Sequence, residues 1–288
     1  MAEISAALVV KLRKMSGQGM GDCKKALEEA NGDMDAAMQI LRKKGLATLA
    51  KRAERETTQG LVVGKINPDG RTAMLASLCC ETDFVSNSDD FKNAAEKLIE
   101  YGMASAKDEG AGNILETAVG GKSYKDVVME LASKTGEKTE VGDFAKYKLA
   151  GAGIICMYIH FNRKVGTMVE IDTNDDKTAG AEQIKRIGTD IAMHITATKP
   201  LALDKTGIAA DIIEREKAVY AEQVKDKPAN IVDKIVEGKM KKFFEDNCLL
   251  DQKFVKDDSK TVAQVLQDAA KQAGGTATIK KFVRFDVG

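Results

Sequence analysis

The chain has 288 residues, with 44 basic and 44 acidic side chains and a formal net charge of zero. This length favours two or more folding units with several small cores. The balance of charge argues against binding of nucleic acid or of an anionic membrane by the molecule as a whole, which needs a net basic face, and leaves only a local patch open. No apolar run reaches the roughly 20 residues of a membrane span, and the start, MAEISAALVV, lacks the features of a secretion or transit signal. We therefore expect a cytoplasmic protein without a membrane or direct nucleic-acid partner.

The first 45 residues have the pattern of three short helices separated by turns. Ser5 is expected to cap the first helix, and the second helix starts at Met20. Asp33 is expected to cap a third helix that stops at Gly45. The residues that follow predict a separate connecting helix. Residues 1–55 carry 11 basic and 7 acidic side chains, a net charge of +4. This part is therefore a mildly basic head with a minimal core of its own.

The central part shows one pattern twice, a β-hairpin followed by a helix. Residues 60–66 and 71–81 flank the turn NPDG, and residues 153–161 and 165–172 flank the connection NRK. A segment with helical spacing of apolar residues follows each hairpin. This order predicts an α+β fold whose body has two core subdomains, each with a small antiparallel sheet. Between the two hairpins, Ser123 is expected to cap one helix.

The last part predicts an inserted helical hairpin, in which Pro228 stands near the start of the second helix. Its apolar stripe could pack internally or against another protein, and the sequence favours neither. Ser259 is expected to cap a further helix, and the ending TIKKFVRFDVG to add a strand to the second sheet. The predicted division is a head (1–55), subdomain N (56–140), subdomain C (141–200 and 243–288) and the hairpin (201–242).

Signals for chemistry along the chain fail on inspection. The stretch GGKSY lacks the earlier glycine of a phosphate-binding loop, and AGAGIIC lacks the third glycine of a dinucleotide site. The five cysteines are odd in number and contain no C-x-x-C, so reduced thiols are expected. Neither His160 nor His194 has the spacing of a zinc ligand. We expect no enzyme, no metal and no cofactor, although a Cys/His nucleophile pair using Cys80 or Cys156 stays open.

The segment CCETDFVSN, residues 79–87, places Phe84 in a loop rich in turn-forming residues. In one interpretation Phe84 folds back as a lid on its own small core. In the other it is displayed for a partner, where a buried aromatic ring contributes roughly 1.5–3 kcal/mol. The residues alone do not decide between the two.

The chain resembles bacterial elongation factor Ts, the guanine-nucleotide exchange factor of the GTPase elongation factor Tu, over essentially its whole length. The segments that carry the resemblance are LRKMSGQGMGDCKKALEEANGDMDAAMQILRKKG, CETDFVSN, AMHITATKP and FVRFDVG. The resemblance implies a UBA-like three-helix module at the N-terminus, two α+β subdomains that touch two domains of the GTPase, and a dimerisation or protruding helical hairpin. A homodimer or a 2:2 complex with the GTPase stays open.

The resemblance also implies site residues. The family's T-D-F-V motif falls on Thr82, Asp83, Phe84 and Val85, and its phenylalanine wedges between helices of the GTPase near the bound Mg²⁺, so that GDP leaves. Met20 matches the first methionine of a family segment that packs on the GTPase, although Gly21 replaces the second. His160 lies in YIHFNRKVG, which is similar to a strand that meets another domain of the GTPase. The chain stops at Gly288, where well-known members continue into a further helix.

Two other classes of function compete with this reading. A non-catalytic scaffold would recruit a translation or ubiquitin-like partner through the UBA-like head, and the loop around Phe84 would be inert. A thiol enzyme would depend on the five cysteines.

Overall fold

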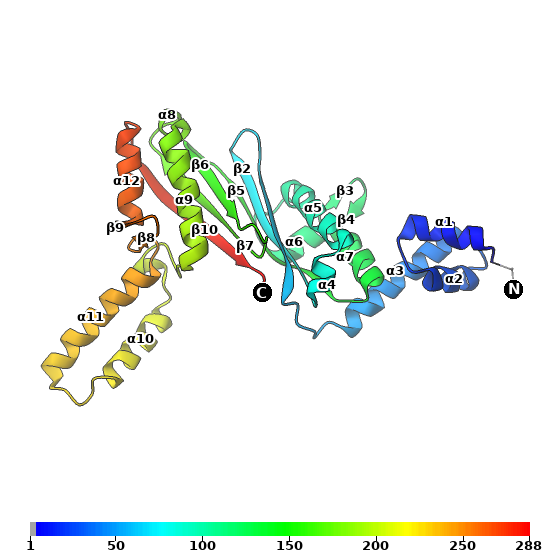
Figure 1. Cartoon of the computed structure of the whole chain (residues 1–288), viewed down its shortest axis with the longest axis horizontal. Helices are drawn as coiled ribbons and strands as arrows, with labels where there is room; N and C mark the ends of the chain where they lie inside the picture. Colours follow the sequence, from blue (N-terminus) through cyan, green and yellow to red (C-terminus); the bar gives the residue numbers. More distant parts are fainter. Residues whose placement is uncertain (1–3) are drawn as a thin grey trace.

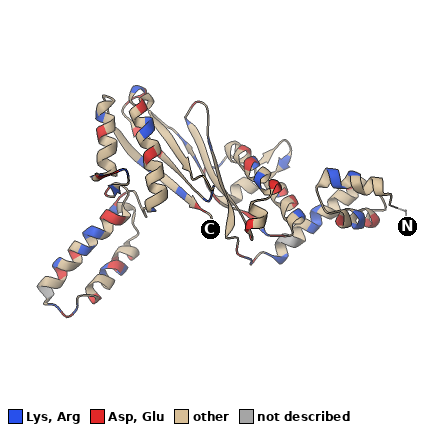
Figure 2. Ribbon diagram, in the orientation of Figure 1, with Lys and Arg blue, Asp and Glu red and all other residues tan. Residues whose placement is uncertain are grey.

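The computed structural model describes residues 4–288, apart from the side chains of residues 48, 49, 229 and 230. The molecule is elongated (Figure 1): the helical head lies at one end, the two sheets lie in the middle, and a helical hairpin projects near the other end. Basic and acidic residues are interspersed along the helices (Figure 2). In the described chain, no helix combines the length and the apolar character needed to cross a bilayer.

The head is a three-helix unit, formed by α1 (Ala6–Ser16), α2 (Met20–Glu29) and α3 (Met34–Lys51). Its caps are those predicted, because the Ser5 hydroxyl accepts a hydrogen bond from Leu8 N and Asp33 Oδ1 accepts one from Ala36 N at 2.8 Å. Leu12 and Leu27 are fully buried in its core. The local sequence therefore accounts for the starts of α1 and α3, whereas α2 begins after Gly19 without a side-chain cap.

The third helix does not stop at Gly45, and the separate connecting helix is wrong, because α3 continues to Lys51. Gly45 faces α7 (Tyr124–Thr135) at close range: a Cβ atom at this position would lie 2.6 Å from the carbonyl oxygen of Met129. Glycine is used here because the backbones of two helices approach closely. The gain from packing outweighs the weak helix propensity of glycine.

The first sheet has the strand order β1–β2–β5, with β1 (Gln59–Ile66), β2 (Thr72–Cys80) and β5 (Thr139–Lys148), all antiparallel. As predicted, alternate residues of β2 enter one core, where they meet α5 (Asp89–Ala104) and α7. Strand β5 was not predicted, and the expected boundary between residues 140 and 141 falls inside it. Between α5 and α7 lie the short elements α6 (Ala111–Leu115), β3 (Ala118–Val119) and β4 (Lys122–Ser123). Ser123 caps α7 as predicted, in a capping box with Asp126.

The second sheet has the order β10–β7–β6, with β6 (Gly153–Ile159), β7 (Val165–Thr173) and β10 (Ala277–Asp286), so the last strand extends this sheet as predicted. It is covered by α9 (Glu182–Thr198) and α12 (Val262–Gln272), and α8 (Asp176–Gly180) precedes α9. Ser259 does not cap α12. It lies in β9 (Asp257–Thr261), which pairs with β8 (Lys253–Phe254), and Thr261 forms the cap instead.

The two sheets share a third core, so the subdomains are packed on each other. Val62 and Leu75 of the first sheet meet Met168 of the second within it. Two glycines permit this approach: a Cβ at Gly64 would lie 2.5 Å from Met157 Sδ, and a Cβ at Gly166 would lie 2.7 Å from Val62 Cγ1. The close fit sets the relative position of the loops that each sheet carries.

The helical hairpin consists of α10 (Ala210–Glu222) and α11 (Ala229–Asn247), so its second helix extends beyond the predicted end at 242, and a 3₁₀ turn (Lys205–Gly207) precedes it. At its base, Ile212 and Phe244 pack in a small core around Cys248. No described residue of α10 is buried, and Val219 and Ile231 are exposed. The apolar stripe is therefore packed internally at the base and open to solvent further out.

The contact at Gly45 predicts that Gly45→Ala will destabilise the chain although alanine favours helix. The methyl group would push α3 away from α7, at a cost of about 1–3 kcal/mol. Urea denaturation followed by circular dichroism measures the change. The matched control is Gly238→Ala in α11, where a Cβ would meet nothing within 4 Å, and which should stabilise by about 0.5–1 kcal/mol. Equal effects of the two substitutions would contradict this account.

Candidate functional site

The segment predicted as a loop after β2 forms a helical turn, α4 (Asp83–Ser86). Thr82 caps this turn, since its hydroxyl accepts a hydrogen bond from Val85 N at 3.4 Å. Ser88 caps α5 in the same way, because its hydroxyl accepts from Phe91 N at 3.3 Å. Two caps in succession hold the T-D-F-V segment in one compact conformation between β2 and α5.

Within α4, neighbouring side chains point in different directions because successive helical residues are about 100° apart. Val85 is buried in the core of the first sheet, whereas Phe84 is 85% exposed. The interpretation of Phe84 as a lid on its own core is therefore wrong. Asp83 is also exposed, and its carboxylate makes no hydrogen bond or ion pair with another described residue. The turn thus presents a ring and a carboxylate side by side to solvent.

Two carboxylates, those of Glu81 and Glu137, hold the backbone at the start of the turn; these contacts are called the brace below. Glu137 accepts hydrogen bonds from Thr82 N at 3.1 Å and from the Thr82 hydroxyl at 2.7 Å. Glu81 accepts two hydrogen bonds from Arg52, at 2.9 and 2.7 Å, and one from Lys138 N at 2.6 Å. Because Arg52 directly follows α3, this ion pair connects the end of the head to the base of the turn.

The ion pair also sets the ionisation of Glu81. Burial alone would raise the pKa of its carboxyl, but the hydrogen bond from Lys138 N and the guanidinium of Arg52 together lower the pKa below its usual value. The carboxylate is therefore charged throughout the neutral range and keeps its contacts there.

The other predicted partner residues lie apart from this turn. Met20 is the first residue of α2 in the head, at one end of the molecule, whereas α4 lies nearer the middle (Figure 1), and it is 40% exposed. A Cβ at the neighbouring Gly21 would meet nothing within 4 Å, so the missing methionine would have been exposed as well. His160 is half-buried just after β6, where its Nδ1 lies 2.9 Å from the Tyr158 hydroxyl in a hydrogen bond. Met20, His160 and the turn α4 therefore lie on three separate elements of the chain.

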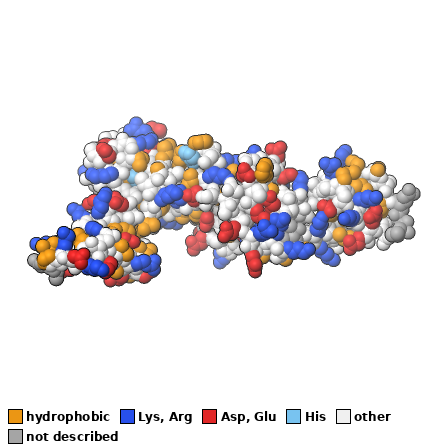
Figure 3. All heavy atoms as spheres, turned by 60° about the horizontal axis from the view of Figure 1, so that its bottom comes forward, with side chains coloured by type: hydrophobic (Ala, Val, Ile, Leu, Met, Phe, Trp, Pro, Cys, Tyr) orange, Lys and Arg blue, Asp and Glu red, His pale blue; other side chains and the backbone are white. Residues whose placement is uncertain are grey.

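One exposed aromatic side chain escaped the sequence analysis. Phe161 lies in the turn between β6 and β7 and is 88% exposed. Phe161 directly precedes the turn-forming residue Asn162, and an aromatic residue beside a turn is the same signal that singled out Phe84. The space-filling view in Figure 3 shows orange hydrophobic side chains between the charged ones on the face it presents.

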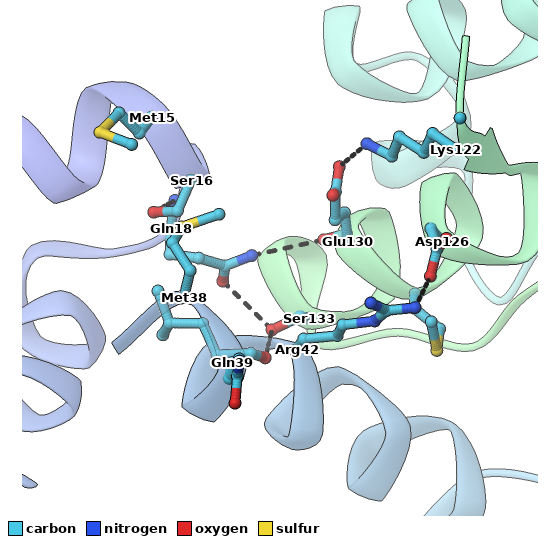
Figure 4. Close-up of a pocket in the computed structure, with 13 residues that line it drawn as sticks. Met15, Ser16, Gln18, Met38, Gln39, Arg42, Lys122, Asp126, Glu130 and Ser133 are labelled. Atoms are coloured by element: carbon cyan, nitrogen blue, oxygen red, sulfur yellow. Dashed lines mark hydrogen bonds and ion pairs between the residues drawn. The ribbon is translucent and has the colours of Figure 1, made fainter. Parts of the chain in front are cut away.

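A cavity of about 350 Å³ lies where the head meets α7 (Figure 4). Gln18 spans it: its amide nitrogen donates to the carbonyl oxygen of Glu130 at 3.4 Å, and its amide oxygen accepts from the Ser133 hydroxyl at 3.3 Å. Arg42 forms an ion pair with Asp126 at the rim. These contacts join the head to subdomain N, and the charged residues that line the cavity are paired with one another, Arg42 with Asp126 and Lys122 with Glu130.

The cysteines do not form a reactive centre. All five are buried and unbridged, and burial raises the pKa of the Cys80 and Cys156 thiols to about 12. His194 is buried too, and burial lowers its pKa; its Nε2–H donates to Gln252 Oε1 at 2.8 Å while Nδ1 accepts from Val255 N. This histidine therefore fastens α9 to the segment after α11. Among residues 4–288, no cluster of three His, Cys, Asp or Glu side chains could hold a metal ion.

Comparison with known proteins adds a consistent set of relatives. The family model described as elongation factor TS matches residues 81–288. An elongation factor Ts of Nitratiruptor sp. is 42% identical over 99% of this chain and 93% of its own length. Those of Desulfovibrio desulfuricans and Chlorobium phaeobacteroides are each 37% identical, over 100% of this chain and 99% and 100% of their own lengths. These relatives cover the head as well as the two subdomains.

The brace at Glu81 leads to a pH-dependent prediction for Glu81→Gln. Since the folded pKa lies below the unfolded one, near 4.5, the carboxylate stabilises the fold above that pH, and this contribution is lost as the pH falls through the folded pKa. We expect the variant to be less stable by about 1–2 kcal/mol at neutral pH, with a difference that shrinks in acid.

Urea denaturation at neutral pH and in acid tests this expectation. The control is Glu214→Gln, which removes an exposed ion pair with Lys217 on α10 and should change stability by less than about 0.5 kcal/mol. A difference for Glu81→Gln that stays constant with pH would refute the role assigned to the ionised carboxylate.

Proposed function

The chain belongs to the elongation factor Ts family of translation elongation factors, and from this premise we propose that it binds the GDP form of elongation factor Tu and promotes GDP release. The partner is the one that the resemblance implies. The main support for the proposal is the exposure of Phe84. Its ring is 85% exposed, on a turn that is capped by Thr82 and followed by the cap Ser88. A soluble protein gains nothing in its own stability from such a ring, so a partner surface is the natural place for its burial.

The proposed action of Phe84 is mechanical. The ring inserts between helices of the GTPase near the bound Mg²⁺, and the resulting shift weakens Mg²⁺ coordination and the grip on the phosphates of GDP. The brace supports this role, because an inserted side chain transmits force only if its own backbone does not yield. Glu81 and Glu137 hold the base of the turn through five hydrogen bonds. Asp83 stands beside the ring with its carboxylate free to pair with a donor of the GTPase.

The thermodynamics of this step are those of coupled binding. If the chain weakens GDP binding by some factor, GDP must weaken binding of the chain by the same factor. In the ternary complex, both GDP and the chain therefore dissociate readily from the GTPase. GTP can enter after GDP has left. No covalent bond changes and no cofactor takes part, so the chain acts as an exchange factor and not as an enzyme. Met20 and His160 supply further contacts with the GTPase in this proposal.

Phe84→Ala tests the proposal. Removing the ring should slow GDP release at saturating factor by about tenfold or more, since a buried aromatic ring is worth roughly 1.5–3 kcal/mol. Release of fluorescently labelled GDP from elongation factor Tu in a stopped-flow instrument gives the rate.

Two controls make the result interpretable. Circular dichroism and thermal denaturation should be unchanged, because Phe84 contributes little to its own core. Val255→Ala removes another exposed apolar side chain, on the β8–β9 hairpin, and should leave GDP release as it is. Release by Phe84→Ala at the wild-type rate would overturn the wedge mechanism.

A further inference from the structure

The terminal strand β10 forms one edge of the second sheet, whose order is β10–β7–β6. The paired residues of β10, from Ala277 to Asp286, all meet β7. In an antiparallel sheet the N–H and C=O groups of alternate residues point away from the neighbouring strand, so β10 directs one row of them outward. In the described chain, the backbone of residues 280–286 makes no hydrogen bond to any segment other than β7. This row is therefore open for pairing with another strand.

An edge of the first sheet, in contrast, is covered by its own chain. Strand β5 lies at that edge, and the loop before α6 runs beside it. Lys146 N donates to Asp108 O at 2.7 Å, and Gly110 N donates to Phe144 O at 3.4 Å. Covering an edge in this way prevents unwanted pairing with other strands. The open edge of β10 is therefore a feature that needs a physical explanation.

A groove of about 530 Å³ follows the open edge. One wall consists of residues 280–285 of β10, and the other consists mainly of residues 199–203. Because successive side chains of a strand point to opposite faces, a groove that touches consecutive residues lies along the edge of the sheet and not over one face. The second wall is held in place, since Leu201 N donates to Asn247 O at 2.9 Å, while the Leu201 side chain is 56% exposed. The groove therefore has the length of a short strand and an apolar residue on its outer wall.

The groove is basic. Of its lining residues, none is acidic and four are basic: Lys199, Lys280, Lys281 and Arg284. Three acidic residues near the groove offset part of this charge. Glu170 is fully buried, Asp172 lies opposite Thr278 before the lined stretch begins, and Asp286 ends β10 just after it. The surface along the groove itself therefore carries positive charge only.

A β-bulge determines how this charge is arranged. The register of β10 against β7 shifts between Ile279 and Lys281, so Lys280 is an extra residue with no partner opposite. Both lysines consequently reach one carboxylate: Lys280 Nζ donates to Glu170 Oε1 at 2.8 Å, and Lys281 Nζ lies 3.4 Å from Oε2. The carboxylate is buried, whereas the two lysine side chains are 41% and 47% exposed. A molecule that approaches the edge therefore meets the ammonium groups first.

The charge selects the kind of strand that fits this edge. A second copy of β10, paired antiparallel over the lined stretch, would bring Lys281 of one copy opposite Arg284 of the other, and like charges in this position are destabilising. A nucleic acid would match the charge, but its phosphates would leave the row of N–H and C=O groups unpaired and Leu201 uncovered. An extended acidic peptide matches the charge, the open row and the apolar wall together.

We propose that the edge of β10 binds an extended acidic segment of another protein, which adds a fourth strand to the second sheet. Main-chain hydrogen bonds from the open row hold the segment, and its side chains supply the specificity. Lys281 and Arg284 are three residues apart and so point to opposite faces of the sheet, which requires acidic residues at the same spacing in the segment. Apolar residues between them contact Val283 and Leu201. This binding uses no part of the turn α4 and is independent of nucleotide exchange.

The test uses the full chain and a fluorescein-labelled peptide of the repeat Glu-Val-Val-Glu-Val, with fluorescence anisotropy as readout. We expect saturable binding, and hydrogen exchange of the amides in residues 280–286 that slows by about tenfold or more when the peptide is bound. A matched peptide with proline in place of the central valine keeps the charge but lacks an N–H donor. It should bind about tenfold more weakly or less still.

Variants of the chain test the role of charge. Lys281→Gln should weaken binding of the peptide about tenfold, since hydrogen bonds to charged groups are the stronger ones. Lys271→Gln, in the last turn of α12 and outside the groove, is the matched control and should bind as the wild type does. Should circular dichroism show that Lys281→Gln does not fold, Lys199→Gln replaces it, because this side chain is 67% exposed and does not contact Glu170. Its expected loss is about threefold.

Several outcomes would overturn the proposal. One is the absence of saturable binding, and another is equal binding of the valine and proline peptides. Binding of polyuridine RNA that Lys281→Gln weakens, with no binding of the acidic peptide, would assign the groove to nucleic acid. A dimer in sedimentation, with the amides of residues 280–286 already protected in the free chain, would assign the edge to a second copy.

Discussion

The close packing of the two sheets is the constraint on which the rest of the molecule depends. Gly64 and Gly166 leave out the side chains that would keep the sheets apart, and Val62 lies in the shared core. Because this core is filled from both sheets, neither can slide or rotate against the other. The short turns at the ends of β2 and β6 are therefore presented as parts of one rigid body.

Rigid presentation is what an exchange factor that works by contact requires. The turn around Phe84 is held by its own caps at Thr82 and Ser88, by Glu81 and Glu137, and by the burial of Val85. The same design recurs at Phe161, where the backbone is held by β1 and the side chain is free. In both places the described contacts hold the backbone, and the aromatic ring is left exposed to solvent.

Much of the architecture could be read from local patterns, and the errors have identifiable causes. Both hairpins and the caps at Ser5, Asp33 and Ser123 depend on neighbouring residues only, and they are confirmed. Strand β5 was missed because its sequence has weak alternation and it is stabilised by pairing with the distant β2. Helix α3 passes through Gly45 because α7 packs there, which no pattern within the helix reveals. Thr261 replaces Ser259 as a cap because β9 pairs with β8.

The sequence by itself determined the family, the order of the elements and the T-D-F-V segment as the place to examine, since motifs and periodicity depend on residues close together in the chain. Only the tertiary structure decided whether Phe84 is covered or displayed, and it placed Phe161 on the same support. Exposure depends on which distant segments fill the space around a side chain. That is settled by the packing of whole sheets and helices, beyond the reach of local sequence.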